Sequence, residues 1–236
     1  VLSRGLGDVY KRQTIDNDVK HNELSIGYDT AVDVATNALD MLQPTAASHR
    51  RVMILEVMGR DAGHIALNAG IAGGADVILI PEIQYSIKSI ADHIEKLRSK
   101  GRNHALIVVA EAVKKENGKK ATVKYVDGEV RLGGIGNYLG DEIYKITDSE
   151  TRVTVLGHVQ RGAQPTHRDR LIASAFGVYA VDLIAKKKFN RVVVWKDRGV
   201  QDLMLSQVAG YSKTVQKNDP LIKVAEGLGI YIGEIN

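Results

Sequence analysis

Short runs of consecutive apolar residues alternate along the chain with longer segments that have helical periodicity. The apolar runs have the length of strands buried on both faces and occupy residues 51–57, 76–81 and 105–110. Helical spacing of apolar side chains marks the segments 31–42, 62–72 and 86–100. Because buried strands that alternate with helices are typical of a parallel sheet covered on both faces, the pattern predicts an α/β fold.

The alternation resumes after a polar interruption. Residues 114–136 are rich in Gly and Lys, which predicts a loop or a small hairpin that turns at Asp127-Gly128. The pattern then predicts a helix over 136–147, a strand over 152–156, a helix over 168–187 and a strand over 191–195. Turn residues at Asn218-Asp219-Pro220 precede a short helix that should end before Gly229.

Two of these helices carry further predictions. The helix of residues 31–42 should stop near Pro44, because proline removes a hydrogen bond from a helix interior. The helix of residues 168–187 should turn one apolar face inward, formed by Leu171, Ala175, Val178, Ala180 and Ile184.

Composition narrows the class of protein. The chain has 236 residues, of which 44% are hydrophobic and 25% charged, as in ordinary globular proteins. Apolar runs stay below the roughly 18 residues of a membrane span, and no secretory signal pattern opens the chain, so we expect a cytoplasmic protein without membrane partners. The absence of cysteine excludes disulfides, thiolate metal sites and a cysteine nucleophile.

The charge pattern points to a small anion rather than to nucleic acid. The formal charge of +4 arises from 32 basic residues spread among 28 acidic ones, and only Lys186-Lys187-Lys188 and Lys119-Lys120 form clusters. Two Phe and one Trp offer little surface for base stacking. We therefore expect no nucleic-acid partner, and an anionic substrate accounts for the surplus of positive charge.

The first thirteen residues are set apart from the fold prediction. They lack an initiator Met and show no clear amphipathic period, so residues 1–13 are interpreted as a non-native junction. The natural residues before Thr14 are then unknown.

Residues 14–18 (TIDND) form the first of three polar clusters. Two carboxylates, Asp16 and Asp18, stand two residues apart beside a hydroxyl, as suits a loop that takes a proton from an alcohol and helps to hold a divalent cation. The alternative is that both aspartates are turn and helix-cap residues.

The other two clusters each follow an apolar strand, where open α/β sheets place ligand sites. Met58-Gly59-Arg60 joins a permissive glycine to an arginine before a helix, which suits an anion, although a surface ion pair explains the arginine equally well. In residues 157–162 (GHVQRG), His158 and Arg161 lie between two glycines that leave room for a phosphate.

Together these clusters resemble the 6-phosphofructokinase family, whose members depend on ATP or diphosphate. The resemblance runs from Thr14 to the C-terminus and includes residues 56–60 (EVMGR), Ala72-Gly73-Gly74 and the strand exit Pro81-Glu82. The longer loop over 112–134 and the C-terminal residues 228–233 resemble the subgroup of the family that contains diphosphate-dependent and mixed members. Ala163 departs from the family's usual glycine, and Gln43 stands where regulated members often have arginine.

The resemblance implies catalytic roles for the first cluster. Asp16 resembles the base that accepts the proton of the sugar 1-hydroxyl, and Asp18 resembles its neighbour on the side of the metal, which would be Mg²⁺. Thr14 resembles the hydroxyl beside the transferring phosphoryl group, and Arg60 also lies close to that group in the family.

The same resemblance implies a set of sugar-phosphate contacts. Met58, Gly59 and Arg60 correspond to the segment along the sugar, and Glu111 to a carboxylate that accepts hydrogen bonds from its hydroxyls. His158 and Arg161 correspond to the pair that holds the 6-phosphate. The adjacent subunit of a dimer or tetramer would supply two more arginines, Arg51 and Arg152.

As a fold, the resemblance implies two Rossmann-like three-layer halves with mostly parallel sheets. Residues 28–158 and 201–236 would form the sugar-phosphate half, and residues 14–27 and 159–200 a remnant of the donor-binding half, whose N-terminal part we expect to be missing.

The implied activity is that of a glycolytic 6-phosphofructokinase, which converts fructose 6-phosphate to fructose 1,6-bisphosphate. The donor loop lies upstream of the TIDND motif in the family, so ATP and diphosphate both stay open as donors, and we expect this chain alone to be inactive. The alternatives are a diphosphate--fructose-6-phosphate 1-phosphotransferase and a non-catalytic subunit that senses sugar phosphate.

Overall fold

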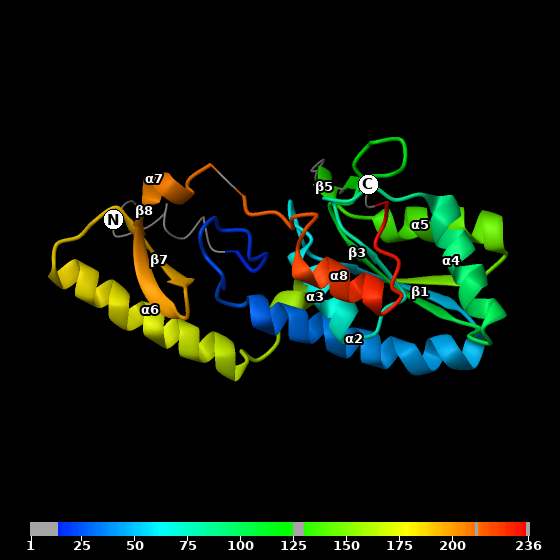
Figure 1. Ribbon diagram of the computed structural model, residues 1–236, viewed down its shortest axis with the longest axis horizontal. Helices are drawn as coiled ribbons and strands as arrows, with labels where there is room; N and C mark the ends of the chain where they lie inside the picture. Colours follow the sequence, from blue (N-terminus) through cyan, green and yellow to red (C-terminus); the bar gives the residue numbers. More distant parts are fainter. Residues whose placement is uncertain (1–13, 125–129, 211, 235–236) are drawn as a thin grey trace.

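A four-stranded parallel sheet forms the centre of the larger part of the molecule (Figure 1). The computed structural model describes residues 14–124, 130–210 and 212–234. The sheet has the strand order β2-β3-β1-β6, and its strands are β1 (Val52–Val57), β2 (Val77–Leu79), β3 (Ala105–Ala110) and β6 (Thr151–Val155). The α/β fold with a mostly parallel sheet is therefore confirmed.

Helices cover both faces of this sheet (Figure 1). One face packs against α2 (Tyr28–His49) and α3 (His64–Ala72), with α8 (Pro220–Gly227) lying against α3. The other face packs against α5 (Ile135–Thr147), which in turn contacts α4 (Ile87–Ser99). The side chain of Ser86 caps α4 by accepting a hydrogen bond from the Ser89 N–H. Among the described helices, none is long and apolar enough to cross a membrane.

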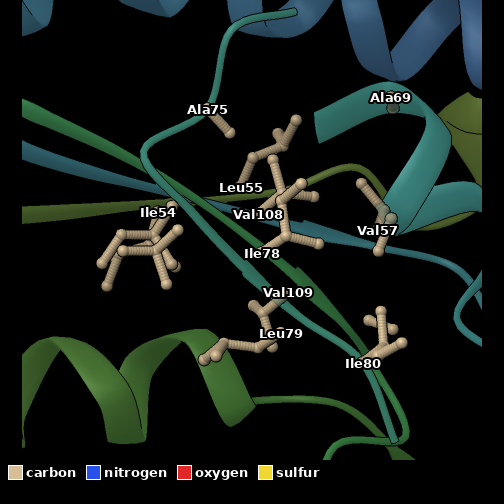
Figure 2. Close-up of a cluster of buried hydrophobic side chains, with 14 of the residues drawn as sticks. Ile54, Leu55, Val57, Ala69, Ala75, Ile78, Leu79, Ile80, Val108 and Val109 are labelled. Carbon is tan, nitrogen blue, oxygen red and sulfur yellow. The ribbon is translucent and has the colours of Figure 1, made fainter. Parts of the chain in front are cut away.

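The core lies between the sheet and its helices, and Figure 2 shows its buried aliphatic side chains. All six residues of β1 and of β3 are buried, as continuous apolar strands require. Two helical glycines mark where helix and sheet approach most closely. A Cβ on Gly70 of α3 would lie 2.5 Å from Ile78 Cγ1, and one on Gly136 of α5 would lie 2.8 Å from Val153 Cγ1. These positions have no space for a larger residue.

A smaller part of the molecule extends away from the sheet (Figure 1). It contains α6 (His167–Ala185), an antiparallel hairpin of β7 (Arg191–Lys196) and β8 (Gly199–Met204), and the single turn α7 (Leu205–Val208). Strand β7 was predicted, but β8 was not. The hairpin turn uses Asp197 and Arg198 at φ values of 51° and 61°, a conformation that arginine does not signal in a sequence.

Asp169 joins the two parts where α6 and α2 begin. Its buried carboxylate accepts hydrogen bonds of 2.8 Å from the backbone N–H groups of Gly27 and Thr30, and another from the Thr30 hydroxyl. It therefore satisfies free N–H groups in the first turn of α2 from the first turn of α6.

The prediction that the first helix ends near Pro44 was wrong. Helix α2 continues to His49 with Pro44 inside it. Pro44 is exposed, while Leu39 and Ala46 on either side of it are fully buried. Packing of those side chains outweighs the hydrogen bond that proline removes.

The predicted inward face of α6 was also wrong. Leu171, Val178 and Ile184 are 62%, 67% and 63% exposed, and the buried apolar side chains are Ile172 and Leu183. Among the described residues, α6 packs against β7, β8 and α2 on one side only, so its opposite face stays in contact with solvent.

The polar segment after β3 forms the predicted small hairpin. Strands β4 (Thr122–Lys124) and β5 (Val130–Leu132) pair in antiparallel fashion. The predicted turn at Asp127-Gly128 lies outside the described residues.

Candidate active site

Three loops leave the sheet on the same side, at the carboxyl ends of the strands, because the three neighbouring strands β3, β1 and β6 run in parallel. In the register of the sheet, Val57 of β1 pairs with Ala110 of β3, and Glu56 pairs with Val155 of β6. The segments that begin at Met58, Glu111 and Leu156 therefore start side by side. Open α/β sheets bind their ligands at these carboxyl ends of the strands.

The TIDND loop is held in shape by its buried asparagine. Asn17 adopts a φ of 57°, accepts a 2.9 Å hydrogen bond from the Ser25 N–H and donates a 3.0 Å bond to the Glu23 carbonyl. The Thr14 hydroxyl accepts a 3.0 Å bond from the Asp16 N–H. These bonds fix the loop, so the positions of both aspartates are set by backbone geometry.

Asp16 is a half-buried carboxylate with an unused oxygen. Its Oδ1 is buried and has no hydrogen-bond partner among the residues described. Burial raises the pKa of Asp16, and the charge of Asp18 raises it further, while Arg161, the Arg60 backbone N–H and the Thr14 hydroxyl act to lower it. A raised pKa suits a carboxylate that must accept a proton.

Glu111 is a second carboxylate close enough to Asp16 to interact with its charge. Burial raises its pKa, as do the charges of Asp16 and Glu56, whereas a hydrogen bond from the Gly59 backbone and the charge of Arg161 lower it. Arg161 therefore lies within electrostatic reach of both carboxylates. The site combines two carboxylates of raised pKa with the exposed guanidinium of Arg161.

Gly59 has a geometric reason to be glycine. It adopts a φ of 150°, and a Cβ there would lie 2.9 Å from the Ala62 carbonyl oxygen. This conformation lets the chain turn directly after β1, with Met58 half-buried and the Arg60 side chain exposed.

His158 and Arg161 lie on a 3₁₀ turn, η1 (Gly157–Arg161), that follows β6. Both side chains are exposed, whereas Gln160 between them is buried. The Gln160 Oε1 accepts a 2.9 Å hydrogen bond from the Met58 N–H, and its Nε2 donates a 3.1 Å bond to the Ala31 carbonyl. Sequence analysis missed Gln160, although its place between two candidate ligands was a signal.

Arg51 and Arg152 do not join this site within one chain. They lie at the amino ends of β1 and β6, on the side of the sheet opposite the carboxyl ends that Met58 and Glu111 follow. Arg51 Nε lies 2.8 Å from Glu150 Oε2, and Arg152 also pairs with Glu150. Their supply to the site of an adjacent subunit stays a prediction.

The C-terminal segment contributes a lysine that sequence analysis also missed. The Lys213 N–H donates a 2.6 Å hydrogen bond to the Asp18 carbonyl, and its Nζ donates a 2.7 Å bond to the Asn22 carbonyl. Burial lowers the pKa of Lys213, and the charge of Asp18 acts against that shift. Nothing in the sequence pattern relates this tail residue to the TIDND loop.

The carboxylates at the site fit a cation whose other ligands come from a bound phosphorylated substrate. Within the described ranges, no group of three or more His, Asp or Glu side chains could hold a metal ion. Asp16 and Asp18 supply two carboxylates, and Mg²⁺ is often held by one or two carboxylates together with substrate phosphates. Asp18 is thus a fitting ligand for Mg²⁺ that arrives with a phosphorylated donor.

A cavity of about 490 Å³ opens beside the TIDND loop. Its lining includes Thr14, Ile15, Arg161, Asp169 and Arg170, so it lies between the candidate site and the start of α6. The cavity therefore adjoins the candidate site on the side of the smaller part of the molecule.

Comparison with protein families matches residues 9–184 to the model described as phosphofructokinase. A relative in Nostoc sp., "ATP-dependent 6-phosphofructokinase 1", is 55% identical over 94% of this chain. The "ATP-dependent 6-phosphofructokinase" of Chloroflexus aurantiacus is 43% identical over the same share. The chain spans 62% and 61% of the length of these two relatives.

Solved structures share the fold. The pyrophosphate-dependent phosphofructokinase of Nitrosospira multiformis superposes with a TM-score of 0.76 at 21% identity, covering 94% of this chain and 59% of the other. Phosphofructokinase of Pichia pastoris in its T-state gives a TM-score of 0.69 at 29% identity, covering 92% of this chain and 23% of the other.

Proposed function

Since this chain belongs to the phosphofructokinase family, we propose that it carries the fructose 6-phosphate site and the catalytic base of a 6-phosphofructokinase. The observation that supports this most directly is the buried Asp16 Oδ1, which has no partner among the described residues and lies within electrostatic reach of Arg161. An oxygen in that state is ready to accept a hydrogen bond from a substrate hydroxyl.

In the proposed reaction, Asp16 takes the proton of the sugar 1-hydroxyl while that oxygen attacks the terminal phosphorus of the donor. Phosphoryl transfer needs little covalent help from the protein, so catalysis rests on positioning, charge neutralisation and this base. The raised pKa of Asp16 strengthens it as a proton acceptor, and Arg161 keeps enough positive charge nearby for the ionised form to persist.

The remaining roles follow the same proposal. Glu111 accepts hydrogen bonds from sugar hydroxyls, and Met58, Gly59 and Arg60 line the sugar, with Arg60 also near the transferring group. His158 and Arg161 bind the 6-phosphate from η1, which suits them because both side chains reach solvent at the sheet edge.

A second copy of the chain would complete the phosphate site. We assign Arg51 and Arg152 to the site of a neighbouring subunit, since both lie on the edge opposite their own Asp16. The proposal therefore includes a homo-oligomer, a dimer or a tetramer.

ATP is the proposed donor, because the curated relatives carry that donor in their names. Diphosphate is the alternative, favoured by the name of the Nitrosospira structure. Mg²⁺ bound with the donor, next to Asp18 and Thr14, would neutralise charge on the transferring group. We place residues 14–27 and 159–200 in the donor-binding half, and residues 28–158 and 201–236 in the sugar-phosphate half. We also place the protein in the cytoplasm, and the lack of cysteine fits such a reducing compartment.

The test is calorimetric titration of the 236-residue chain with fructose 6-phosphate. We expect saturable binding that Arg161→Ala weakens by roughly tenfold or more, the consequence of losing one charge-assisted hydrogen bond. Arg168→Ala is the matched control, because Arg168 is also exposed but lies at the start of α6, where its Nη1 is 3.7 Å from Asp29 Oδ1 of α2. Fructose without phosphate should bind far more weakly to the unmodified chain.

Two results would count against the proposal. One is equal binding of fructose and fructose 6-phosphate, and the other is equal loss of binding in both arginine variants. Wherever turnover is measurable, formation of fructose 1,6-bisphosphate with ATP and with diphosphate, assayed in parallel, separates the two donors.

A further inference from the structure

Gln160 is a fully buried polar side chain at the junction of three elements. Its exposed fraction is 1%, and it lies where η1 packs against β1 and α2. Burying an amide without partners is costly, so its hydrogen bonds matter to this junction. The family resemblance gave Gln160 no role.

Both ends of the Gln160 amide are used, and in opposite directions. Oε1 accepts from the Met58 N–H at 2.9 Å, and Nε2 donates to the Ala31 carbonyl at 3.1 Å. Only a side chain with one donor and one acceptor at its end can make both bonds. Gln160 thereby connects the segment after β1 with the first turn of α2.

The geometry of η1 relates this buried amide to the exposed cations. A 3₁₀ helix has three residues per turn, so His158 and Arg161, three positions apart, project from the same side. Gln160 projects from a different side, into the protein. The amide therefore anchors the turn from behind while its other face presents the histidine and the arginine to solvent.

We propose that Gln160 is a positioning residue that sets the distance between the phosphate-binding pair His158 and Arg161 and the sugar-binding segment of Met58 to Arg60. Its bond to the Met58 N–H connects these two halves of the sugar-phosphate site directly. The inference rests on the proposed function, because the pair acts on a phosphate only if the substrate is a sugar phosphate.

The experiment measures the dissociation constant of fructose 6-phosphate for the full chain and its melting temperature in parallel. Gln160→Met keeps the length of the side chain but loses both hydrogen bonds, and we expect binding at least tenfold weaker in protein that is still folded. Gln201→Met is the control, because Gln201 is half-buried on β8, away from η1, and its Nε2 donates a long hydrogen bond of 3.4 Å to the Lys196 carbonyl.

Gln160→Glu provides a readout that a purely structural role would not give. A protonated glutamate has the donor and the acceptor of glutamine, whereas the ionised form has only acceptors. From about pH 8.5 to about pH 5.5, the affinity of Gln160→Glu should therefore recover toward that of the unmodified chain measured at the same pH.

Each outcome decides the inference. Binding by Gln160→Met within twofold of the unmodified chain overturns it and leaves the proposed function intact. If Gln160→Met does not fold, Gln160→Glu decides, and a constant affinity deficit across pH rejects the positioning role, as does failure of both variants to fold. If the unmodified chain does not bind fructose 6-phosphate, the proposed function fails and this inference fails with it.

Discussion

Asp16 shows how one residue at a loop acquires its chemistry from its neighbours. Burial and the Asp18 charge raise its pKa, and Arg161 lowers it. Removing either charge should therefore move the titration of Asp16 in a known direction.

We predict that Asp18→Asn lowers the pKa of Asp16 and that Arg161→Ala raises the pKa values of both Asp16 and Glu111. Carboxyl carbon signals followed by NMR through a pH titration of the chain would report each group. Asp33→Asn, a change on the outer side of α2, is the control and should leave both groups unchanged. A shift of Asp16 to higher pH in Asp18→Asn would contradict the arrangement of charges.

Asp16→Ser tests the proposed role of Asp16 as the base. Wherever turnover is measurable, we expect a loss of about 10²–10⁴-fold in kcat, the usual effect of removing a general base, with little change in the affinity for fructose 6-phosphate. Steady-state kinetics against sugar concentration checks this, and near-normal kcat would reduce Asp16 to a turn residue.

At this scale the sequence predicted residues that the structure brings close together, while their roles stay predictions, and it did not predict the residues that hold them in place. Asp16, Glu111 and Arg161 stand in recognisable motifs, and the structure brings them together. Gln160 and Lys213 act through hydrogen bonds to backbone groups distant in sequence, and such partners are known only once the fold is known.

At the scale of elements, close packing of helix against sheet is concentrated at glycine. Gly70 on α3 would place a Cβ 2.5 Å from Ile78, whereas Gly177 on α6 has open space around it. Both glycines lie inside helices, so alanine has the same effect on helix propensity at each.

We predict that Gly70→Ala destabilises the chain by about 1–3 kcal/mol through overpacking. Gly177→Ala should instead stabilise it by about 0.5–1 kcal/mol. Urea unfolding of the two variants gives the comparison, and equal effects would mean that α3 does not approach the sheet as closely as described.

His64, at the start of α3, carries a pH prediction. Burial lowers its pKa, although its contact with the Lys213 carbonyl at 3.0 Å opposes the shift. Below about pH 6.5 the unfolded chain binds a proton that the folded chain does not, so His64 costs stability as the pH falls through that range. His64→Asn should show a smaller loss of melting temperature between about pH 7 and about pH 5 than the unmodified chain. An identical pH profile would show that His64 titrates normally.

The limits of sequence reasoning at this scale are local and physical. Apolar runs predicted β1, β2 and β3 within a few residues because those strands are buried on both faces. Pro44 misled the prediction because it lies on the exposed side of α2, and β8 was missed because its side chains are mostly half-buried and show no clear alternation.

Buried apolar side chains are distributed unevenly over the whole molecule. The parallel sheet and its helices contain most of the buried apolar residues, whereas the outer face of α6 exposes Leu171, Val178, Val181 and Ile184. An exposed apolar face of this kind favours self-association.

We predict that Leu171→Lys combined with Val178→Lys lowers the light scattering of concentrated chain without lowering its melting temperature, since both side chains are more than half exposed. Ile172→Lys is the contrasting variant, because Ile172 is 2% exposed and should destabilise the protein when charged. Unchanged scattering in the double variant would mean that this face does not cause association.

The hydrogen bonds of Asp169 couple the start of α6 in the smaller part of the molecule to the start of α2 in the larger part. The starts of α2 and α6 meet at this carboxylate, where Thr166 and Arg168 also contact α2, and residues 162–166 separate α6 from η1. A rotation of α6 about this junction would reach His158 and Arg161 through that short segment, whereas the Asp16 loop is joined to α2 through residues 19–27. Such a rotation would change the candidate site from the side of α6, with no change in the parallel sheet.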